Sequence, residues 1–447
     1  MKRLLKGGRV LDPAGGVDGF FDVLVDGDRV ARVGRDLPVD RDVEVVEVPR
    51  GFVVVPGLID MHVHLREPGQ EHKETIATGV LAAVAGGFTA VACMPNTAPI
   101  NDNAGVTEFI LKKAAEAGLA RVYPIGAVTR GSKGEQLADI AELHASGCAA
   151  ISDDGHPVAT ALIMRRALEY TRMFDLPVID HCEDPTLKGD GVAHEGYQAS
   201  ALGLRGIPGA AEEIMVARDV ILAGMTGGRV HIAHMSARGS LGAVRHGKAQ
   251  GFSVTCEVAP HHFTLTDEAL ARPVKYDTNC KMNPPLRDAA DVEAMIAGIA
   301  DGSVDAIATD HAPHHSDEKN VEFDRAPFGI VGLETCVPLT LDRLVHRGHI
   351  SLARAVELLS VNPARILRRP GGTLAEGAVA DITVLAPDAR VTIRAAGLRS
   401  RSKNTPFDGW ELRGAAAATI VGGRTVFVNP DVAGADVFAM AAGRMKN

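Results

Sequence analysis

The middle of this 447-residue chain alternates between short β-rich runs and Ala-rich stretches with helical periodicity. Such alternation is typical of βα units and of a parallel sheet. Eight β-rich runs can be counted, at residues 58–64, 89–96, 121–129, 149–154, 177–183, 229–236, 253–262 and 305–314. Helix candidates lie between them, for example at 74–85, 158–174 and 210–223. This pattern predicts an α/β fold with a (β/α)8 barrel of the TIM type, and a doubly wound open sheet is the alternative.

The two ends of the chain have a different, strand-rich texture. Residues 23–25, a turn at 26–28 and residues 30–33 have the pattern of a β-hairpin. Strand-like segments return at 381–385, 419–421 and 425–428. We therefore expect a small β-sandwich domain formed by an N-terminal part, 1–55, and a C-terminal part, 371–447. The catalytic barrel would occupy 56–370, and the length of the chain accommodates both domains.

The composition argues against several classes of function. Aromatic residues make up only 4% of the chain, so platforms for stacking nucleic-acid bases are not expected. A net charge of -9 without a long basic run gives no electrostatic footprint for nucleic acid or an anionic membrane. The six cysteines lack CxxC spacing, and neither a signal peptide nor a membrane-spanning run is found. We expect a cytoplasmic protein with reduced thiols and a small-molecule substrate.

Polar residues close nearly every β-rich run. His62 and His64 lie two apart at the end of the first run, and side chains i and i+2 of a strand share a face. Two imidazoles on one face can grip a metal, and a pair of hydrogen-bonded polar histidines is the alternative. Later runs end in Asp153-Asp154, His181, His234 and Asp310. Because strand ends converge at the C-terminal face of a barrel, the sequence predicts one metal site there.

The donor types indicate which metal the site would hold. Nitrogen and oxygen ligands suit Zn²⁺, with Co²⁺ or Mn²⁺ as substitutes. A carboxylate can bridge two metal ions about 3.5–4 Å apart. We therefore expect one or two zinc ions per chain, bridged by an Asp if there are two. Strand alternation sends only one of Asp153 and Asp154 inward and does not say which.

Two longer motifs make the pattern specific. Residues 60–69 (D-M-H-V-H-L-R-E-P-G) and 308–319 (A-T-D-H-A-P-H-H-S-D-E-K) resemble the two signatures of dihydroorotases within the amidohydrolase superfamily. Weaker similarity covers almost the whole chain, including 94–97, 181–184 and 281–287. The pattern resembles the longer bacterial dihydroorotases of class I.

The resemblance implies a role for each site residue. One metal would be held by His62, His64 and Asp310, the second by His181 and His234, and Asp154 would bridge them. Dihydroorotate would be bound by His64, Arg66, Asn96, Asn283 and His314, and by the backbone around Phe328 and Gly329. Asp310 would also be the catalytic acid and base.

These roles fit the chemistry of dihydroorotate, a cyclic imide with one carboxylate. A metal lowers the pKa of bound water toward ~7 and polarises the ring carbonyl. Asp310 can carry the proton of the water to the leaving nitrogen. Arg66 can grip the substrate carboxylate through two parallel N–H bonds. In reverse the site would cyclise N-carbamoyl-L-aspartate, the direction of pyrimidine biosynthesis that the resemblance implies.

One position of the sequence distinguishes this chain from several other members of the superfamily. Hydantoinases, allantoinases and animal dihydroorotases use a carboxylated Lys at the end of strand four, where this chain has Ser152-Asp153-Asp154. This difference argues against a hydantoinase- or allantoinase-type enzyme, which is the first alternative. The second is a non-catalytic scaffold partner of aspartate carbamoyltransferase, and the presence of every ligand type argues against it. A homodimer and a complex of the active enzyme with aspartate carbamoyltransferase are both compatible with the sequence.

Two segments keep open interpretations. Residues 315–327 are polar and follow the last strand, so they form either a mobile lid or an ordinary surface loop. His261 and His262 end the seventh run and either orient metal ligands or have a structural role.

Overall fold

Eight parallel strands form the central sheet in a computed structural model that describes residues 2–39 and 41–441. In chain order they are β6 (Leu58–Val63), β7 (Phe88–Cys93), β8 (Arg121–Gly126), β9 (Ala150–Ile151), β10 (Pro177–Asp180), β13 (Arg229–Ile232), β14 (Val254–Val258) and β15 (Ala306–Ile307). Each is paired with the next. A parallel bridge between Val63 and His311 joins the first strand to the segment after the last. The sheet therefore nearly closes, and the predicted (β/α)8 barrel is confirmed.

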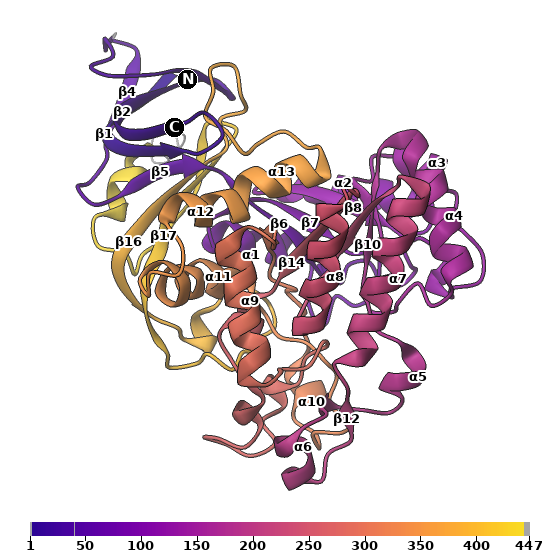
Figure 1. Ribbon diagram of the computed structural model, residues 1–447. Coiled ribbons are helices and arrows are strands. Elements are labelled where there is room, and N and C mark those ends of the chain that lie inside the picture. Colours follow the sequence, from indigo (N-terminus) through magenta and orange to yellow (C-terminus); the bar gives the residue numbers. More distant parts are fainter. Residues whose placement is uncertain (1, 40, 442–447) are drawn as a thin grey trace.

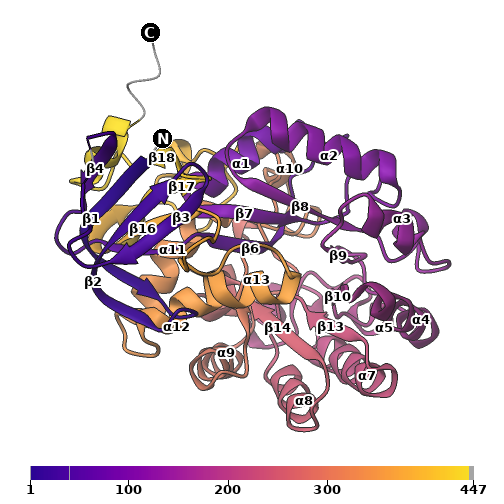
Figure 2. The same ribbon diagram turned by 90° about the horizontal axis from the view of Figure 1, so that it is seen from above.

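Helices follow most of these strands and surround them, as Figure 2 shows. The larger ones are α1 (Ile76–Ala85), α2 (Ala104–Ala117), α4 (Ala161–Thr171), α7 (Ala210–Thr226), α8 (Arg238–Ala249), α9 (Ala289–Asp301) and α11 (Leu333–Thr340). The shorter ones are α3 (Ile140–Ala145), α5 (Pro185–Lys188), α6 (Tyr197–Leu202), α10 (Ser316–Lys319), α12 (Leu352–Val356) and α13 (Asn362–Leu367). Helix α1 starts after Thr75 because the side chain of this residue caps the helix by accepting from Thr78 N.

A continuous aliphatic cluster holds the helices against the barrel. It includes Val91 and Val178 from the strands and Val80, Val216 and Val244 from the helices, all fully buried. Burial of one face of each helix against the sheet is the main source of stability in such layered folds. This packing also determines where the strand ends lie, and therefore where the residues that follow them lie.

The two ends of the chain meet in a second sheet of eight strands (Figure 1). Its members are β1 (Lys2–Asp12), β2 (Val17–Asp26), β3 (Arg29–Gly34), β4 (Val43–Glu47), β5 (Val53–Pro56), β16 (Ile382–Thr392), β17 (Glu411–Val421) and β18 (Arg424–Val428). Strand β5 pairs antiparallel with β16, so N- and C-terminal segments share one ladder. Val23, Val54 and Val384 pack into one apolar cluster. The expected β domain built from both ends is confirmed, and the predicted hairpin is β2–β3.

The connection between the two sheets is short. Strand β5 ends at Pro56 in the terminal sheet, and β6 starts at Leu58 in the barrel. We keep 1–55, 56–370 and 371–447 as proposed domain boundaries. A two-stranded parallel ribbon of β11 (Ala193–His194) and β12 (Gly206–Ile207) lies in the long loop before α7. Among the described residues, no helix has both the length and the apolar character needed to cross a membrane.

The barrel strands end earlier than the β-rich runs of the sequence. His64 follows the last residue of β6, and His234 and Asp310 also lie beyond their strands. Asp310 has a φ of 48° and His234 a φ of 28°, both in the left-handed region, which is incompatible with a strand. His62 lies within β6, and His64 lies one residue past its end, where its N–H still donates to His311 O over 2.9 Å. Both residues nevertheless reach the same centre.

Candidate metal centre and substrate cavity

Four histidine rings and two carboxylates meet at the C-terminal end of the barrel. This donor cluster consists of His62, His64, Asp154, His181, His234 and Asp310. Each of the six residues is 7% exposed or less. They belong to, or follow, strands β6, β9, β10, β13 and β15. The fold therefore brings together all six residues that the sequence predicts as metal ligands.

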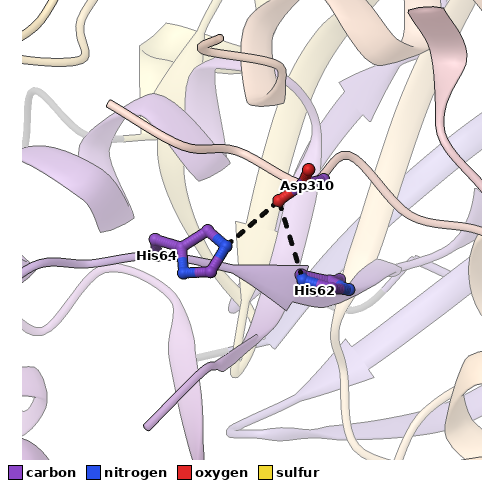
Figure 3. A group of neighbouring side chains, drawn as sticks. All are labelled: His62, His64 and Asp310. Carbon is purple, nitrogen blue, oxygen red and sulfur yellow. Dashed lines mark hydrogen bonds and ion pairs between the residues drawn. The ribbon is translucent and has the colours of Figure 1, made fainter. Parts of the chain in front are cut away.

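Asp310 faces the two histidines of the first strand (Figure 3). Its Oδ1 lies 3.0 Å from His64 Nε2 and 3.6 Å from His62 Nε2. One ligand atom from each of the three residues lies within 4.8 Å of the other two. Two imidazole nitrogens and one carboxylate oxygen at this spacing are suitable ligands for one divalent cation.

Asp154 lies between that trio and the other two histidines. Its Oδ1 is 3.5 Å from His234 Nε2 and 3.7 Å from His181 Nδ1. Its Oδ2 is 3.5 Å from His64 Nε2. Asp153 turns away instead, because its carboxylate accepts hydrogen bonds from the backbone N–H and the hydroxyl of Thr129. The geometry therefore favours Asp154 for the predicted bridging position.

The donor cluster contains polar atoms that the protein itself leaves unpaired. Among the described residues, neither His62 Nε2 nor Asp154 Oδ1 has a hydrogen-bond partner, although both are buried. These two atoms are 3.4 Å apart. Burying an unpaired polar atom costs about 1–3 kcal/mol, which a bound cation would offset. The residues present thus fit a metal ion with nitrogen and oxygen ligands.

The rear nitrogens of two histidines are held by neighbouring side chains. His62 Nδ1 lies 2.7 Å from Glu257 Oε1, and His64 Nδ1 lies 2.8 Å from Asn96 Oδ1. An oxygen at the rear nitrogen keeps a proton there, so Nε2 is the nitrogen that faces the cluster and would bind a metal after giving up its own proton. Both rings are therefore oriented with Nε2 toward the cluster.

Glu257 was missed as a site residue by reasoning from the sequence. It lies within β14 in the run V-T-C-E-V and is 1% exposed. A local signal did exist, because a Glu inside an apolar strand is rarely fully buried unless it is paired. Its second oxygen lies 3.1 Å from His231 Nε2. Glu257 therefore connects His62 to a second, wholly internal histidine.

The carboxylates of the site stay ionised despite their burial. Burial raises the pKa of Asp154, but the charge of His62 and the neighbouring rings of His181 and His234 hold this pKa well below its usual value. Burial likewise raises the pKa of Glu257, and the charge of His62 and a hydrogen bond from His231 outweigh it and lower the pKa to about 2. Ionised carboxylates give this end of the barrel the negative charge that attracts cations.

A cavity of about 310 Å³ opens onto the donor cluster. Its wall includes every residue predicted to bind substrate, namely His64, Arg66, Asn96, Asn283, His314, Phe328 and Gly329. Lys188 of α5 also lines it. This volume is at the lower end of the range for small-molecule sites and suits a compact polar ligand.

Arg66 is a buried cation on this wall, 8% exposed. Its Nε donates to Pro313 O over 3.2 Å, and its Nη2 lies 3.4 Å from His314 Nε2. Burial lowers the pKa of Arg66 to about 10, so the guanidinium keeps its charge at neutral pH. A guanidinium has five N–H donors, and the remaining ones can grip a carboxylate.

Gly329 brings backbone to the opposite wall. It has a φ of 122°, and a Cβ at this position would lie 2.6 Å from the Cβ of Ala312. Only glycine tolerates both the conformation and the close approach. The predicted backbone contact with substrate therefore has a local structural cause.

The two segments with open interpretations are now placed. Residues 315–327 include α10, and the buried Lys319 donates from Nζ to Pro327 O and Gly329 O over 2.9 and 3.0 Å. These bonds tie the segment to the cavity wall, and its mobility stays a prediction. His262 Nε2 lies 3.0 Å from Pro284 O. In the described part of the chain, no hydrogen bond joins His261 or His262 to a predicted metal ligand, so that role also stays a prediction.

Comparison with known families and relatives gives a consistent result. The family described as "Dihydro-orotase-like" matches residues 51–240, and the family described as "Amidohydrolase family" matches residues 260–427. A dihydroorotase of Syntrophotalea carbinolica is 55% identical over 427 residues, which cover 96% of this chain and 99% of the relative. A dihydroorotase of Geobacter metallireducens is 54% identical over 427 residues, covering 96% and 100%.

Solved structures with similar folds include hydantoinases and dihydropyrimidinases. An L-hydantoinase (dihydropyrimidinase) from Arthrobacter aurescens has a TM-score of 0.85 at 23% identity, covering 96% of this chain and 97% of the other. A dihydropyrimidinase from Brevibacillus agri NCHU1002 has a TM-score of 0.81 at 21% identity, covering 98% and 97%. At these identities the likeness concerns the fold alone.

Proposed function

The chain belongs to the dihydroorotase family, and we propose that it catalyses the reversible hydrolysis of (S)-dihydroorotate to N-carbamoyl-L-aspartate. In the cell the reaction would run as cyclisation in de novo pyrimidine biosynthesis. One observation carries the proposal: all seven predicted substrate-binding residues line one cavity that opens onto the donor cluster. A hydantoinase-type activity is the alternative with the same fold. Asp154 in place of a Lys, together with Arg66 on the wall, supports dihydroorotate instead.

The cofactor in this proposal is Zn²⁺, with one or two ions per chain. His62, His64 and Asp310 would hold one ion, His181 and His234 the other, and Asp154 would bridge them. When bound, zinc supplies a water of lowered pKa and a Lewis acid for the ring carbonyl. The unpaired buried atoms of His62 and Asp154 support this assignment.

Asp310 is the proposed proton carrier. In ring opening, water adds to the ring carbonyl carbon, the C–N bond breaks and the nitrogen gains a proton. Burial raises the pKa of Asp310, but the hydrogen bond from His64 and the charges of His62 and His234 outweigh it and keep the pKa below its usual value. An ionised carboxylate at the cavity wall can accept the proton of the water and return it to the nitrogen.

The other wall residues would bind and orient the ring. Arg66 would pair with the substrate carboxylate, because its guanidinium is charged and has donors to spare. Asn96 uses its Oδ1 to hold His64, so its amide nitrogen can donate to the substrate. Asn283 and His314 lie on the same wall and can complete the hydrogen bonds to the ring.

A substrate panel tests the proposal. Purified protein is given dihydroorotate, hydantoin and allantoin in separate assays, and the ring-opened product of each substrate is measured. Turnover of dihydroorotate is expected. Turnover of hydantoin without turnover of dihydroorotate would overturn the proposal. Metal analysis of the same anaerobically purified samples tests zinc and its number, and absence of any metal in fully active protein would refute the metal site.

Location and assembly are further parts of the proposal. We expect the enzyme in the cytoplasm, where the pyrimidine precursors are made, and both a homodimer and a complex with aspartate carbamoyltransferase are compatible with the proposed function. Light scattering of the purified protein, alone and mixed with that enzyme, measures the mass of each species. If the protein is a monomer in both samples, both the homodimer and the complex with aspartate carbamoyltransferase are refuted.

A further inference from the structure

The connection between β16 and β17 leaves the terminal sheet and reaches the cavity. Within it, residues 398–405 form a segment that we call the connector. Four of its polar side chains are almost completely buried: Ser400, Ser402, Asn404 and Thr405, each 6% exposed or less. Polar side chains in a loop normally face solvent, and buried ones are hydrogen-bonded. The contacts of the connector therefore indicate what it does.

The first part of the connector is fastened to the loop after β6. Arg401 N donates to Glu74 Oε1 over 3.0 Å, and the hydroxyl of Ser400 donates to the other oxygen of Glu74. The Ser402 hydroxyl donates to Lys73 O over 2.7 Å. Glu74 itself is fully buried. This part of the connector is thus held against the loop that also carries Arg66.

Asn404 is bonded to the two loops on the other side of the cavity. Its Oδ1 accepts from His314 N over 3.1 Å. Its Nδ2 donates to Ala312 O and to Gly329 O, each over 3.1 Å. Its backbone oxygen accepts from Val331 N over 2.9 Å. The side chain uses its oxygen and both amide hydrogens, and within the described residues it makes no hydrogen bond to the donor cluster.

We propose that Asn404 is a positioning residue for substrate binding, resting on the dihydroorotase function proposed above. It holds the His314 loop and the Phe328–Gly329 backbone at a fixed separation, and this separation sets the width of the cavity where the ring is received. Through this side chain, a segment of the terminal β domain contributes to the substrate cavity of the barrel.

The chemistry of the three bonds explains why the residue is Asn. The position needs one acceptor and two donors on a short planar group. Aspartate supplies no donor and would turn an oxygen toward the two carbonyls of Ala312 and Gly329. His314 Nε2 also donates to Phe328 O over 2.8 Å, so a shift of either loop would alter the other. Misplacement by about 1 Å in such a site can cost about 10²-fold in rate.

Steady-state kinetics of Asn404→Ala and Asn404→Asp test the proposal. We expect KM for dihydroorotate to rise tenfold or more in both, with kcat changing less and metal content unchanged. Asn429→Ala is the matched control, because Asn429 also lies in the terminal β domain and its side chain bonds Ala416 O and Asp431 N over 3.0 Å. Its KM should equal that of the wild type. Unchanged KM in both Asn404 variants would overturn the inference.

A double-mutant cycle with His314→Ala separates positioning from a general loss of stability. If Asn404 acts through the His314 loop, the two substitutions share one effect, and the double variant should be little worse than the worse single variant. Multiplicative effects on KM would mean that Asn404 acts elsewhere, and they would overturn the inference.

Hydrogen exchange at the His314 amide gives a readout that does not depend on activity. This amide is bonded to Asn404 Oδ1, so its exchange should be faster in Asn404→Ala and unchanged in Asn429→Ala. Equal protection in wild type and Asn404→Ala would refute the positioning role. If the wild-type protein does not act on dihydroorotate but the His314 amide still exchanges faster in Asn404→Ala, the proposed function is refuted and the positioning role remains.

Discussion

Two buried polar clusters of the barrel each contain two aspartates, but they differ in what surrounds these carboxylates. One is the donor cluster. The other, which we call the Arg218 cluster, consists of Asp180, Cys182, Arg218 and Asp219. Asp180, Cys182 and Asp219 also have ligand atoms within 4.8 Å of one another. Judged by spacing alone, both clusters could bind a metal.

The difference lies in where the positive charge comes from. Arg218 Nη2 lies 3.2 Å from Asp180 Oδ2 and 2.7 Å from Asp219 Oδ1, so the chain supplies its own cation. The donor cluster instead keeps His62 Nε2 and Asp154 Oδ1 unpaired within the described residues and opens onto a cavity. Buried charges persist only when they are paired or bound to metal. Unpaired buried ligand atoms beside a cavity, more than ligand spacing, therefore mark the donor cluster as the candidate metal site.

The largest expected effect concerns the proton carrier of the donor cluster. Asp310→Asn removes the group proposed to move the proton, and kcat for dihydroorotate should fall by about 10²–10⁴-fold. Circular dichroism should show an unchanged fold. A variant with near-normal kcat would reduce Asp310 to a ligand or a bystander.

The next effect concerns the internal cation. Arg218→Met leaves the carboxylates of the Arg218 cluster without a counter-charge, which should lower the free energy of unfolding by about 3–5 kcal/mol. Urea denaturation measures this loss, and Arg218→Lys should recover part of it. Wild-type stability in Arg218→Met would contradict the view that this cluster depends on its arginine.

Glu257 tests whether orientation matters in the donor cluster. Glu257→Gln removes the charge behind His62, and the affinity for metal should fall by about 10–100-fold. Competition with a chelator measures it. Asp219→Asn, which removes a carboxyl group from the Arg218 cluster, should leave metal affinity unchanged. Equal affinities in Glu257→Gln and wild type would remove Glu257 from the site.

Arg66 contrasts with Arg218, because its guanidinium faces a cavity rather than internal carboxylates. Arg66→Lys keeps the charge and loses the planar pair of donors, so KM for dihydroorotate should rise about tenfold while kcat changes less. Initial rates over a range of dihydroorotate concentrations give both constants. An unchanged KM would argue against the carboxylate grip.

The smallest effect is expected for Asp219→Asn. Burial, followed by the charge of Asp180, raises the pKa of Asp219 well above its usual value, so an amide resembles its protonated form. Above pH ~4 the folded protein binds a proton here that the unfolded chain releases, so wild-type stability should fall as pH rises toward the raised pKa. Asp219→Asn should lack this slope and stay within about 1 kcal/mol of wild type at acidic pH. If the stability of Asp219→Asn fell more steeply with rising pH than that of the wild type, the raised pKa of Asp219 would be contradicted.

The sequence predicted the six donors because their positions follow from topology. Strand ends of a barrel converge, so His181 and His234 could be placed beside His62 without knowing any distance. The choice between Asp153 and Asp154 could not be made. Strand β9 contains only two residues, so its alternation does not extend to either aspartate.

Asn404 could not have been found from local pattern. The partners of its side chain lie 75 to 92 residues away, in loops whose conformation depends on the whole barrel. The lengths of the strands could not be predicted from the sequence either, because no local pattern indicates that Asp310 and His234 adopt a left-handed backbone conformation. The strand-like pattern of residues at both ends of the chain predicted strands there, but it did not predict that β5 pairs with β16.

The pairing of β5 with β16 also has a consequence for how the protein is made. Leu58 N donates to Thr383 Oγ1 across the same junction, between residues 325 positions apart. A ribosome produces the N-terminal strands long before β16 exists, at about 5–20 residues per second. One edge of β5 therefore stays unpaired while the whole barrel is synthesised, and exposed edges invite pairing with other chains. The last strands to be made are the ones that protect the first.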